Sequence, residues 1–350
     1  MFFNILDIMN NPFANFYRVP TSLELLDIAF SRAMKSSAQV SKNAPKILKA
    51  RKKEIKRIQV AIKEIIDRIL KIIKMVPIIE EIPEFYRELA SLIVNTDELR
   101  LTLGKLNGIL PILSKIEREY KTRIKKTEIP KEAVKYRREV FGRISSIINK
   151  QKHNLDYLNE IRGELRRIPS IDYEIPSIVI AGYPNVGKSS LVSLISTVKP
   201  EIQPYPFTTK KIIIGHHIVE KNYDKMKLQI IDTPGILDRP MSKRNKIELQ
   251  AILALNLISD LIVFIFDPTP ACGYDIDCQV DLYYEICNNF SKDGKIPIII
   301  VLNKMDLANE EEVQFIKNKL NLNEDDFFLI NALNGKNVKE LLEFVINKLI

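Results

Sequence analysis

Up to about residue 170, apolar residues recur at the spacing of a helix. From Arg51 to Lys74 the opposite helix face is mostly Lys and Arg, and apolar residues recur three or four positions apart at Ile55, Ile58, Ile62, Ile65, Ile69 and Ile73. The last such pattern ends at Ile168, because the proline that follows disfavours further helix. The stretches predicted to be helical are about 21–38, 51–74, 84–94, 97–127 and 135–167. No stretch here is a convincing strand, so we predict a helical bundle domain over residues 1–170.

Beyond Pro169 the pattern changes to short, β-branched, apolar runs that alternate with helical stretches. The predicted strands are 177–182, 211–219, 226–232, 261–267, 296–303 and 327–331. Such alternation is typical of a mostly parallel, doubly wound sheet with helices on both faces. We therefore predict a second domain of α/β class over residues 171–350.

Charge is divided unevenly between the two predicted domains. Residues 1–170 contain 34 Lys and Arg against 20 Asp and Glu, whereas residues 171–350 contain 19 against 24. The first domain thus has an excess of 14 positive charges within a net charge of +9 for the chain. This excess indicates a polyanionic partner. The alternative is that these Lys and Arg only solvate the outer helix faces.

Cysteine spacing and the start of the chain bear on the compartment. Cys272, Cys278 and Cys287 match neither a CxxC pair nor a disulfide framework, which favours reduced thiols. The opening stretch MFFNILDIMNNPF has no basic segment of the kind found in a signal peptide, and no apolar run approaches the ~20 residues of a membrane span. We expect a cytoplasmic protein that does not bind membranes.

The first chemical motif is GYPNVGKS, Gly182 to Ser189, which matches G-x-x-x-x-G-K-[ST] between a predicted strand and a predicted helix. Its glycines let the backbone bend around phosphates, Lys188 would reach the β- and γ-phosphates, and the Ser189 hydroxyl would bind Mg²⁺. The residues predicted here to bind nucleotide are Gly182, Tyr183, Pro184, Asn185, Val186, Gly187, Lys188, Ser189 and Ser190. The motif predicts a P-loop nucleotide-binding domain.

Two further stretches have the character of phosphate-sensing loops. In DTPG, Asp232 would hold Mg²⁺ through water, and the Gly235 N–H would contact the γ-phosphate next to Thr233 and Pro234. The stretch QPYPFTTKK contains Phe207, Thr208 and Thr209, and one threonine would complete the Mg²⁺ shell. The residues alone do not choose between Thr208 and Thr209.

The motif NKMD, Asn303 to Asp306, indicates that the base is guanine. The Asp306 carboxylate would accept hydrogen bonds from guanine N1 and the 2-amino group, a donor pair that adenine lacks. Lys304 belongs to the same motif. A later stretch, Asn331, Ala332 and Leu333, has Asn in place of the more usual Ser, which leaves the Ala332 N–H as the predicted contact to guanine O6. We therefore expect GTP, GDP and Mg²⁺ as ligands.

Several segments together resemble one known family. GYPNVGKSSL, QPYPFTTK, DTPGILDRP, RNKIELQAILAL and CGYDIDCQ in the second half, with IPEFYRELASLIV and LGKLNGI in the first, are similar to the nucleolar GTP-binding protein 1 family of Obg-related GTPases, in its archaeal form. Eukaryotic members of this family continue far beyond the last helix seen here, so contacts of their extensions are not carried over.

The resemblance implies a GTPase that binds precursors of the large ribosomal subunit and contacts their RNA through both domains. It favours Thr209 as the Mg²⁺ ligand. We expect hydrolysis to time release from the subunit, with no DNA partner and a monomeric protein. The alternative is a nucleotide-gated RNA-binding or protein-binding module with negligible hydrolysis.

Ile236 directly follows DTPG, at the position where many GTPases have a glutamine that orients the attacking water. We expect slow intrinsic turnover that depends on Lys188, Thr209 and Gly235. Help would come from K⁺ held by Asn185, which matches an asparagine with that role in some related GTPases, or from the ribosomal particle in trans. Arg244 offers a further charge, but we predict it to be solvated.

Overall fold

The computed structural model describes residues 11–41, 43–207, 211–221, 224–240, 244–291 and 296–349. The chain forms two compact units. The helical unit consists of Phe13–Ile82 and Ile93–Arg166, and the sheet unit contains Pro83–Leu92 and the chain from Arg167 onward.

The helical unit is built from five helices, namely α1 (Ser22–Lys35), α2 (Lys46–Met75), α4 (Thr96–Lys126), α5 (Pro130–Lys150) and α6 (Lys152–Leu165). Helix α2 packs against α1, α4 and α5. The predicted apolar face of α2 is confirmed, because Ile58, Ile62, Ile65 and Ile69 are all at most 1% exposed. Burial of this isoleucine row holds the bundle together.

The single helical stretch predicted over 135–167 is wrong in one respect, since the structure divides it into α5 and α6. Helix α5 ends at Lys150, and the N–H of the next residue, Gln151, donates to the Ile148 carbonyl at 2.9 Å. No apolar residue lies between Ile148 and Leu155, so nothing on the buried face holds one straight helix through this point.

Helix α3 (Glu84–Ile93) lies almost entirely within the sheet unit, although the sequence placed it in the helical bundle domain. Tyr86 of this helix is fully buried, and its hydroxyl accepts a hydrogen bond from the Ile171 N–H at 2.9 Å. The Tyr86 ring also lies 5.7 Å from that of Tyr173. These contacts attach α3 to the start of the sheet unit, and the predicted domain boundary after residue 170 stays a prediction.

The sheet unit contains one sheet of seven strands in the order β2-β3-β4-β1-β5-β6-β7. The strands are β1 (Ser177–Ala181), β2 (Val198–Pro204), β3 (Lys211–Lys221), β4 (Asp224–Asp232), β5 (Leu261–Phe266), β6 (Ile298–Leu302) and β7 (Phe327–Leu329). Pairs β2·β3 and β3·β4 are antiparallel, and the other four are parallel. The mostly parallel sheet is confirmed. Strand β2 was not predicted from the sequence.

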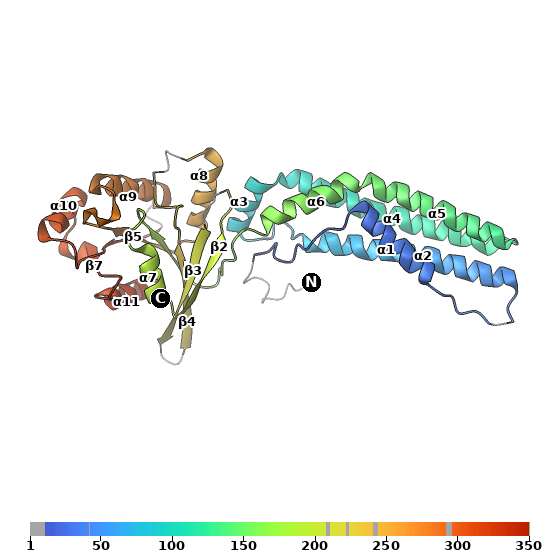
Figure 1. Cartoon of the computed structure of the whole chain (residues 1–350), viewed down its shortest axis with the longest axis horizontal. Coiled ribbons are helices and arrows are strands. Elements are labelled where there is room, and N and C mark those ends of the chain that lie inside the picture. Colours follow the sequence, from blue (N-terminus) through green and yellow to red (C-terminus); the bar gives the residue numbers. More distant parts are fainter. Residues whose placement is uncertain are drawn as a thin grey trace. The chain divides into compact units, whose positions relative to one another are not determined.

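Helices flank this sheet (Figure 1). They are α7 (Lys188–Ile195), α8 (Lys246–Leu253), α9 (Ile276–Phe290), α10 (Glu310–Leu320) and α11 (Val338–Leu349), with short 3₁₀ turns at Ala254–Leu257, Pro270–Cys272 and Glu324–Asp326. Every residue of β1 and β5 is buried, as expected for central strands of a doubly wound sheet. Strands β1, β4, β5 and β6 run parallel, so their carboxyl ends meet at one edge of the sheet. This edge is where such folds bind ligands.

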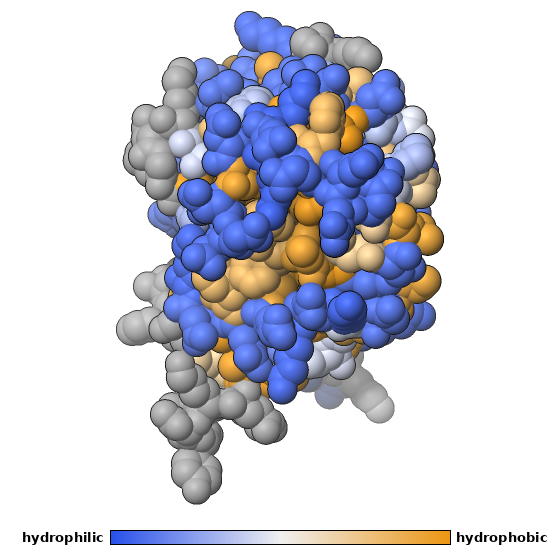
Figure 2. Space-filling view, turned by 90° about the vertical axis from the view of Figure 1, so that its left-hand side faces the viewer, coloured by the Kyte–Doolittle hydropathy of each residue, from blue (hydrophilic) through white to orange (hydrophobic). Residues whose placement is uncertain are grey.

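One outer face of the sheet unit carries apolar residues. On the face shown in Figure 2, at the end of the unit where α10 lies in Figure 1, hydrophobic residues gather in the middle and hydrophilic residues surround them. Phe315 of α10 and Phe344 of α11 are 48% and 44% exposed.

Among the described residues, no helix has the length and apolar character that crossing a membrane requires.

A buried ion cluster links two helices of the helical unit. Glu54 of α2 is 3% exposed, and its carboxylate lies 2.9 Å from Arg57 and 2.7 Å from Arg137 of α5. We expect Glu54→Gln to lower the free energy of unfolding by about 3–5 kcal/mol, because it leaves two largely buried guanidinium groups without their counter-charge. Urea unfolding followed by far-ultraviolet circular dichroism measures this loss.

The matched control is Asp97→Asn, which removes a carboxylate that is 88% exposed and also pairs with an arginine. This variant should unfold close to the wild type, since exposed ion pairs contribute little. Equal stability of the two variants would contradict the structural role given to Glu54.

Candidate nucleotide-binding site

The loop between β1 and α7 has a backbone that only glycine can adopt at two positions. Gly182 has a φ of +136°, and a Cβ there would lie 2.4 Å from the Ile265 carbonyl oxygen. Gly187 has a φ of +103°, and a Cβ would lie 2.1 Å from the side-chain nitrogen of Asn303. Asn185, at a φ of 63°, is exposed in the same loop. The predicted phosphate loop is thus a tight turn leading into a helix N-terminus.

Lys188 lies beneath this loop. Its side-chain nitrogen donates hydrogen bonds to the Gly182 and Tyr183 carbonyls, each at 2.7 Å, and the residue is 6% exposed. Burial lowers the pKa of Lys188, while the charges of Asp232 and Asp238 act in the opposite direction. The loop carbonyls therefore position a cation at the place where the sequence predicts phosphate binding.

Ser189 and Asp232 meet at the predicted Mg²⁺ position. The Ser189 hydroxyl donates to Asp232 Oδ2 at 2.5 Å. Asp232 is fully buried, and its Oδ1 atom has no hydrogen-bond partner among the described residues. Burial raises the pKa of Asp232. A buried carboxylate oxygen without a partner beside a hydroxyl fits Mg²⁺, which prefers oxygen ligands.

At the guanine end, Asn303 joins two loops. Its side-chain N–H donates to the Val186 carbonyl at 2.8 Å, and its Oδ1 accepts from the Ala332 N–H at 2.9 Å. The Ala332 N–H already has an acceptor, so its predicted contact with guanine O6 stays a prediction. Asn331 shapes the same turn by accepting the Leu333 N–H at 2.9 Å. Asp306 is exposed, which leaves its carboxylate accessible to a base.

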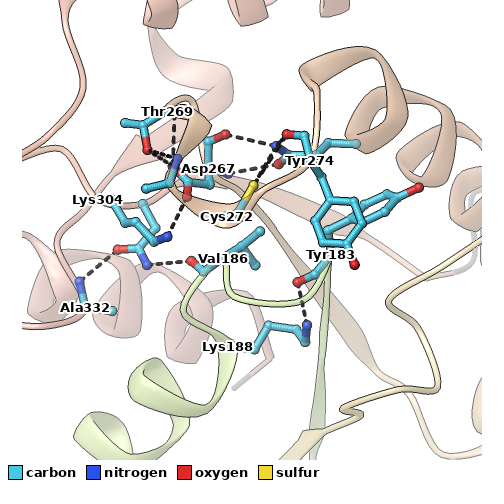
Figure 3. A network of polar contacts seen from close by, with 12 residues as sticks. Tyr183, Val186, Lys188, Asp267, Thr269, Cys272, Tyr274, Lys304 and Ala332 are labelled. Carbon is cyan, nitrogen blue, oxygen red and sulfur yellow. Dashed lines mark hydrogen bonds and ion pairs between the residues drawn. The ribbon is translucent and has the colours of Figure 1, made fainter.

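The structure adds a buried network that the sequence did not explain (Figure 3). Asp267, directly after β5, is fully buried, and its Oδ2 lies 2.6 Å from the side-chain nitrogen of Lys304. Its Oδ1 accepts from both the N–H and the hydroxyl of Thr269, at 2.9 and 2.7 Å. Gln279 of α9 then holds the Asp267 backbone through hydrogen bonds of 3.0 Å to its N–H and its carbonyl. This network fixes the lysine of NKMD from the neighbouring strand end.

The network also contains a contact to the phosphate loop. The ring of Tyr274 packs on that of Tyr183, with centroids 4.6 Å apart. The Gln279 side chain donates to the Tyr274 carbonyl at 3.3 Å. Burial raises the pKa of Tyr183 to about 12, so its hydroxyl stays protonated. The segment after β5 therefore supports both the phosphate loop and the guanine end.

The DTPG loop closes over the end of β1. Thr233 is fully buried and its hydroxyl donates to the Ile180 carbonyl at 3.0 Å. The Gly235 N–H, predicted to contact the γ-phosphate, donates instead to Asp238 Oδ2 at 2.6 Å. Ile236 is 1% exposed and lies within the loop. Its side chain has neither the polar group nor the exposure needed to orient a water.

Two predicted switch residues, Thr208 and Thr209, lie outside the described residues. Phe207, just before them, has a φ of 59° and is 37% exposed.

The prediction that Arg244 is solvated is wrong. Its side chain is 1% exposed, and its guanidinium donates to the Gly235 carbonyl at 3.3 Å and also to the Ile236 carbonyl. Arg244 is buried because the DTPG loop folds its carbonyls toward it.

The geometry thus brings the predicted phosphate loop, the predicted Mg²⁺ position at Ser189 and Asp232, and the predicted guanine-binding loop to one sheet edge. Residues 13–172 match the family model described as NOG1 N-terminal helical domain, and residues 177–304 match that described as 50S ribosome-binding GTPase. The nucleolar GTP-binding protein 1 of Encephalitozoon cuniculi is 33% identical over 323 residues, or 92% of this chain and 58% of that protein. The chain belongs to the nucleolar GTP-binding protein 1 family. Its sheet unit is accordingly a GTPase domain that binds guanine nucleotides.

Other relatives show how much of the family architecture the chain covers. An uncharacterized protein of Methanocaldococcus jannaschii is 38% identical over 308 residues, or 87% of this chain and 83% of that protein. The chain spans about half the length of the eukaryotic relatives, for example 44% of the Drosophila melanogaster nucleolar GTP-binding protein 1. A crystal structure of a Plasmodium falciparum family member is 33% identical, covers 52% of this chain and 90% of that one, and has a TM-score of 0.42.

Asp267 holds Lys304 of the NKMD motif through a buried ion pair. We expect Asp267→Asn to weaken GDP and GTP binding by about 10- to 100-fold, because Lys304 loses its buried counter-charge and the NKMD loop its anchor. Titration calorimetry with either nucleotide measures the change. Asp277→Asn is the matched control, since it removes a 66% exposed carboxylate that also pairs with a lysine. Wild-type affinity in the Asp267 variant would contradict the anchoring role.

Proposed function

We propose that the protein is a slow GTPase that binds precursors of the large ribosomal subunit through their RNA and hydrolyses GTP to time its release. The observation that carries this proposal is a guanine-type phosphate-loop site on the same chain as a helical domain of this family. The family description, 50S ribosome-binding GTPase, supports the choice of partner. The excess of 14 positive charges over residues 1–170 supports RNA as the surface bound.

In this proposal each part of the site has one task. Lys188 and the loop N–H groups neutralise the β- and γ-phosphates, and Asp306 selects guanine. Ser189, Asp232 through water and Thr209 would hold Mg²⁺, which would neutralise charge on the phosphate oxygens as the bond to the γ-phosphate breaks. Gly235 would sense the γ-phosphate.

Slow turnover follows from Ile236. Because this side chain is 1% exposed and apolar, the attacking water has no glutamine to orient it. We propose that help comes either from K⁺ held beside the phosphates by the exposed Asn185 or from the ribosomal particle. The second candidate function, a nucleotide-gated RNA-binding or protein-binding module with negligible hydrolysis, is favoured by the same buried isoleucine.

GTP turnover by the full chain distinguishes a GTPase aided by K⁺ or by the ribosomal particle from a binding module. It should be measured in K⁺ and in Na⁺, each with and without large ribosomal subunits. Acceleration by K⁺ alone supports the Asn185 route, and acceleration by the subunits alone makes the particle both partner and activator. No response to either supports the binding module and contradicts the release timer. The cytoplasmic location, the monomeric state and the absence of a DNA partner stay predictions.

A further inference from the structure

The Gly235 N–H is already occupied by a carboxylate of its own loop. Gly235 donates to Asp238 Oδ2 at 2.6 Å, and this hydrogen bond is buried. Asp238 itself is 9% exposed. A short, buried hydrogen bond from an amide to a carboxylate is among the stronger contacts that a backbone N–H can make. Any other anion that uses this N–H must displace it.

The loop holds Asp238 next to the phosphate loop. The carbonyl of Leu237, the preceding residue, accepts the Gly182 N–H at 3.1 Å. Leu237 is 1% exposed, and its backbone N–H donates to the Thr233 carbonyl at 3.3 Å. These two backbone hydrogen bonds hold Leu237, and with it the start of Asp238, beside the phosphate loop.

The electrostatics agree with this placement. Burial is the largest influence on the pKa of Lys188, which it lowers, and on that of Asp232, which it raises. The Asp238 charge raises both pKa values. A negative group is thus within electrostatic reach of the two side chains predicted to act on the γ-phosphate and Mg²⁺.

Arg244 offers Asp238 a second position. One terminal nitrogen of its guanidinium lies 3.8 Å from Asp238 Oδ1, beyond hydrogen-bond distance. The Arg244 Nε–H is buried and has no hydrogen-bond acceptor among the described residues. A small movement of the Asp238 side chain toward this guanidinium would form a charge-assisted hydrogen bond and free the Gly235 N–H.

We propose that Asp238 competes with the γ-phosphate of GTP for the Gly235 N–H and thereby sets the preference of the site between GTP and GDP, an inference that rests on the proposed GTP-binding function. GDP has no γ-phosphate, so Asp238 keeps the N–H when GDP is bound. GTP brings a second anion to the same donor, and the carboxylate moves to Arg244. The cost of this exchange falls on GTP alone.

The test compares the affinities of the full chain for GTPγS and GDP in Mg²⁺ by titration calorimetry. Asp238→Ala should bind GTPγS about tenfold more tightly than the wild type, or more, with GDP affinity changed less than about twofold. Asp238→Asn keeps the shape and an acceptor but not the charge, so it should shift the same ratio in the same direction by less. Asp281→Ala, an exposed carboxylate on α9, should leave the ratio unchanged.

The measured affinities separate a failure of this inference from a failure of the proposed function. A GTPγS to GDP affinity ratio that neither Asp238 variant changes, in a protein that binds both nucleotides, overturns this inference and leaves the proposed function standing. If Asp238→Ala fails to fold, judged by its circular dichroism spectrum, the Asp238→Asn ratio decides alone. A wild-type protein that binds neither nucleotide overturns both the proposed function and the inference.

Discussion

Asp306→Asn is expected to weaken GTP binding by roughly 100-fold or more and to create affinity for xanthosine triphosphate. The carboxylate would accept two hydrogen bonds from guanine, and it is exposed at the end of the NKMD motif. An asparagine has only one acceptor group for that donor pair, and its NH₂ faces the 2-amino group of guanine. Xanthine has a carbonyl at that position, which can accept from the asparagine. Calorimetric titration with the two nucleotides measures both changes.

The control for this exchange is Glu311→Gln, which removes an exposed carboxylate five residues further on, in the first turn of α10. It should bind GTP as the wild type does and should not bind xanthosine triphosphate. Undiminished GTP binding by the Asp306 variant would show that another group reads the base, with Asn331 and its turn as the place to search.

Lys188→Ala should lower the rate of GTP turnover by about 100- to 1000-fold, the usual effect of removing one preorganised group that stabilises transition-state charge. The lysine nitrogen is held by the Gly182 and Tyr183 carbonyls at 2.7 Å, so it needs little rearrangement to meet phosphate. Turnover under saturating GTP, with and without large subunits, measures the loss.

Lys199→Ala provides the comparison, because this lysine is exposed on β2 and lies outside the phosphate loop. Its turnover should match that of the wild type. Comparable rates in the two variants would exclude Lys188 from phosphate chemistry and would assign its buried position to the loop structure alone.

The elements predicted correctly are those with a strong period. The isoleucine row of α2 and the apolar runs of β1 and β5 repeat over enough residues to fix both type and burial. Strand β2 could not be found this way. Its sequence VKPEIQP contains two prolines, and most of its residues are exposed because it forms the edge of the sheet. The break at Gln151 was missed because Ile148 and Leu155 are seven residues apart, the spacing of two turns on one helix face, although no apolar residue lies between them.

Among the site residues, too, those in a regular sequence pattern were predicted and isolated ones were not. The phosphate loop and NKMD were found because glycine, lysine and aspartate stand at a fixed spacing after predicted strands. Asp267 and Asp238 are single carboxylates without such a spacing, and their partners Lys304 and Gly235 are identified only by the way the loops fold. A carboxylate immediately after β5 was the one available signal for Asp267, because parallel strands β5 and β6 end side by side. Burial of Arg244 had no sequence signal.

Co-sedimentation of the full chain with purified large ribosomal subunits tests the central proposal most directly. The chain should be presented with GTPγS or with GDP, at about 50 and about 200 mM salt. We predict that GTPγS gives at least about tenfold tighter binding than GDP, and that binding weakens steeply with salt because Lys and Arg contact RNA phosphates. Equal binding in the two nucleotides would contradict a GTP-timed release. No binding in either would contradict the ribosomal partner itself.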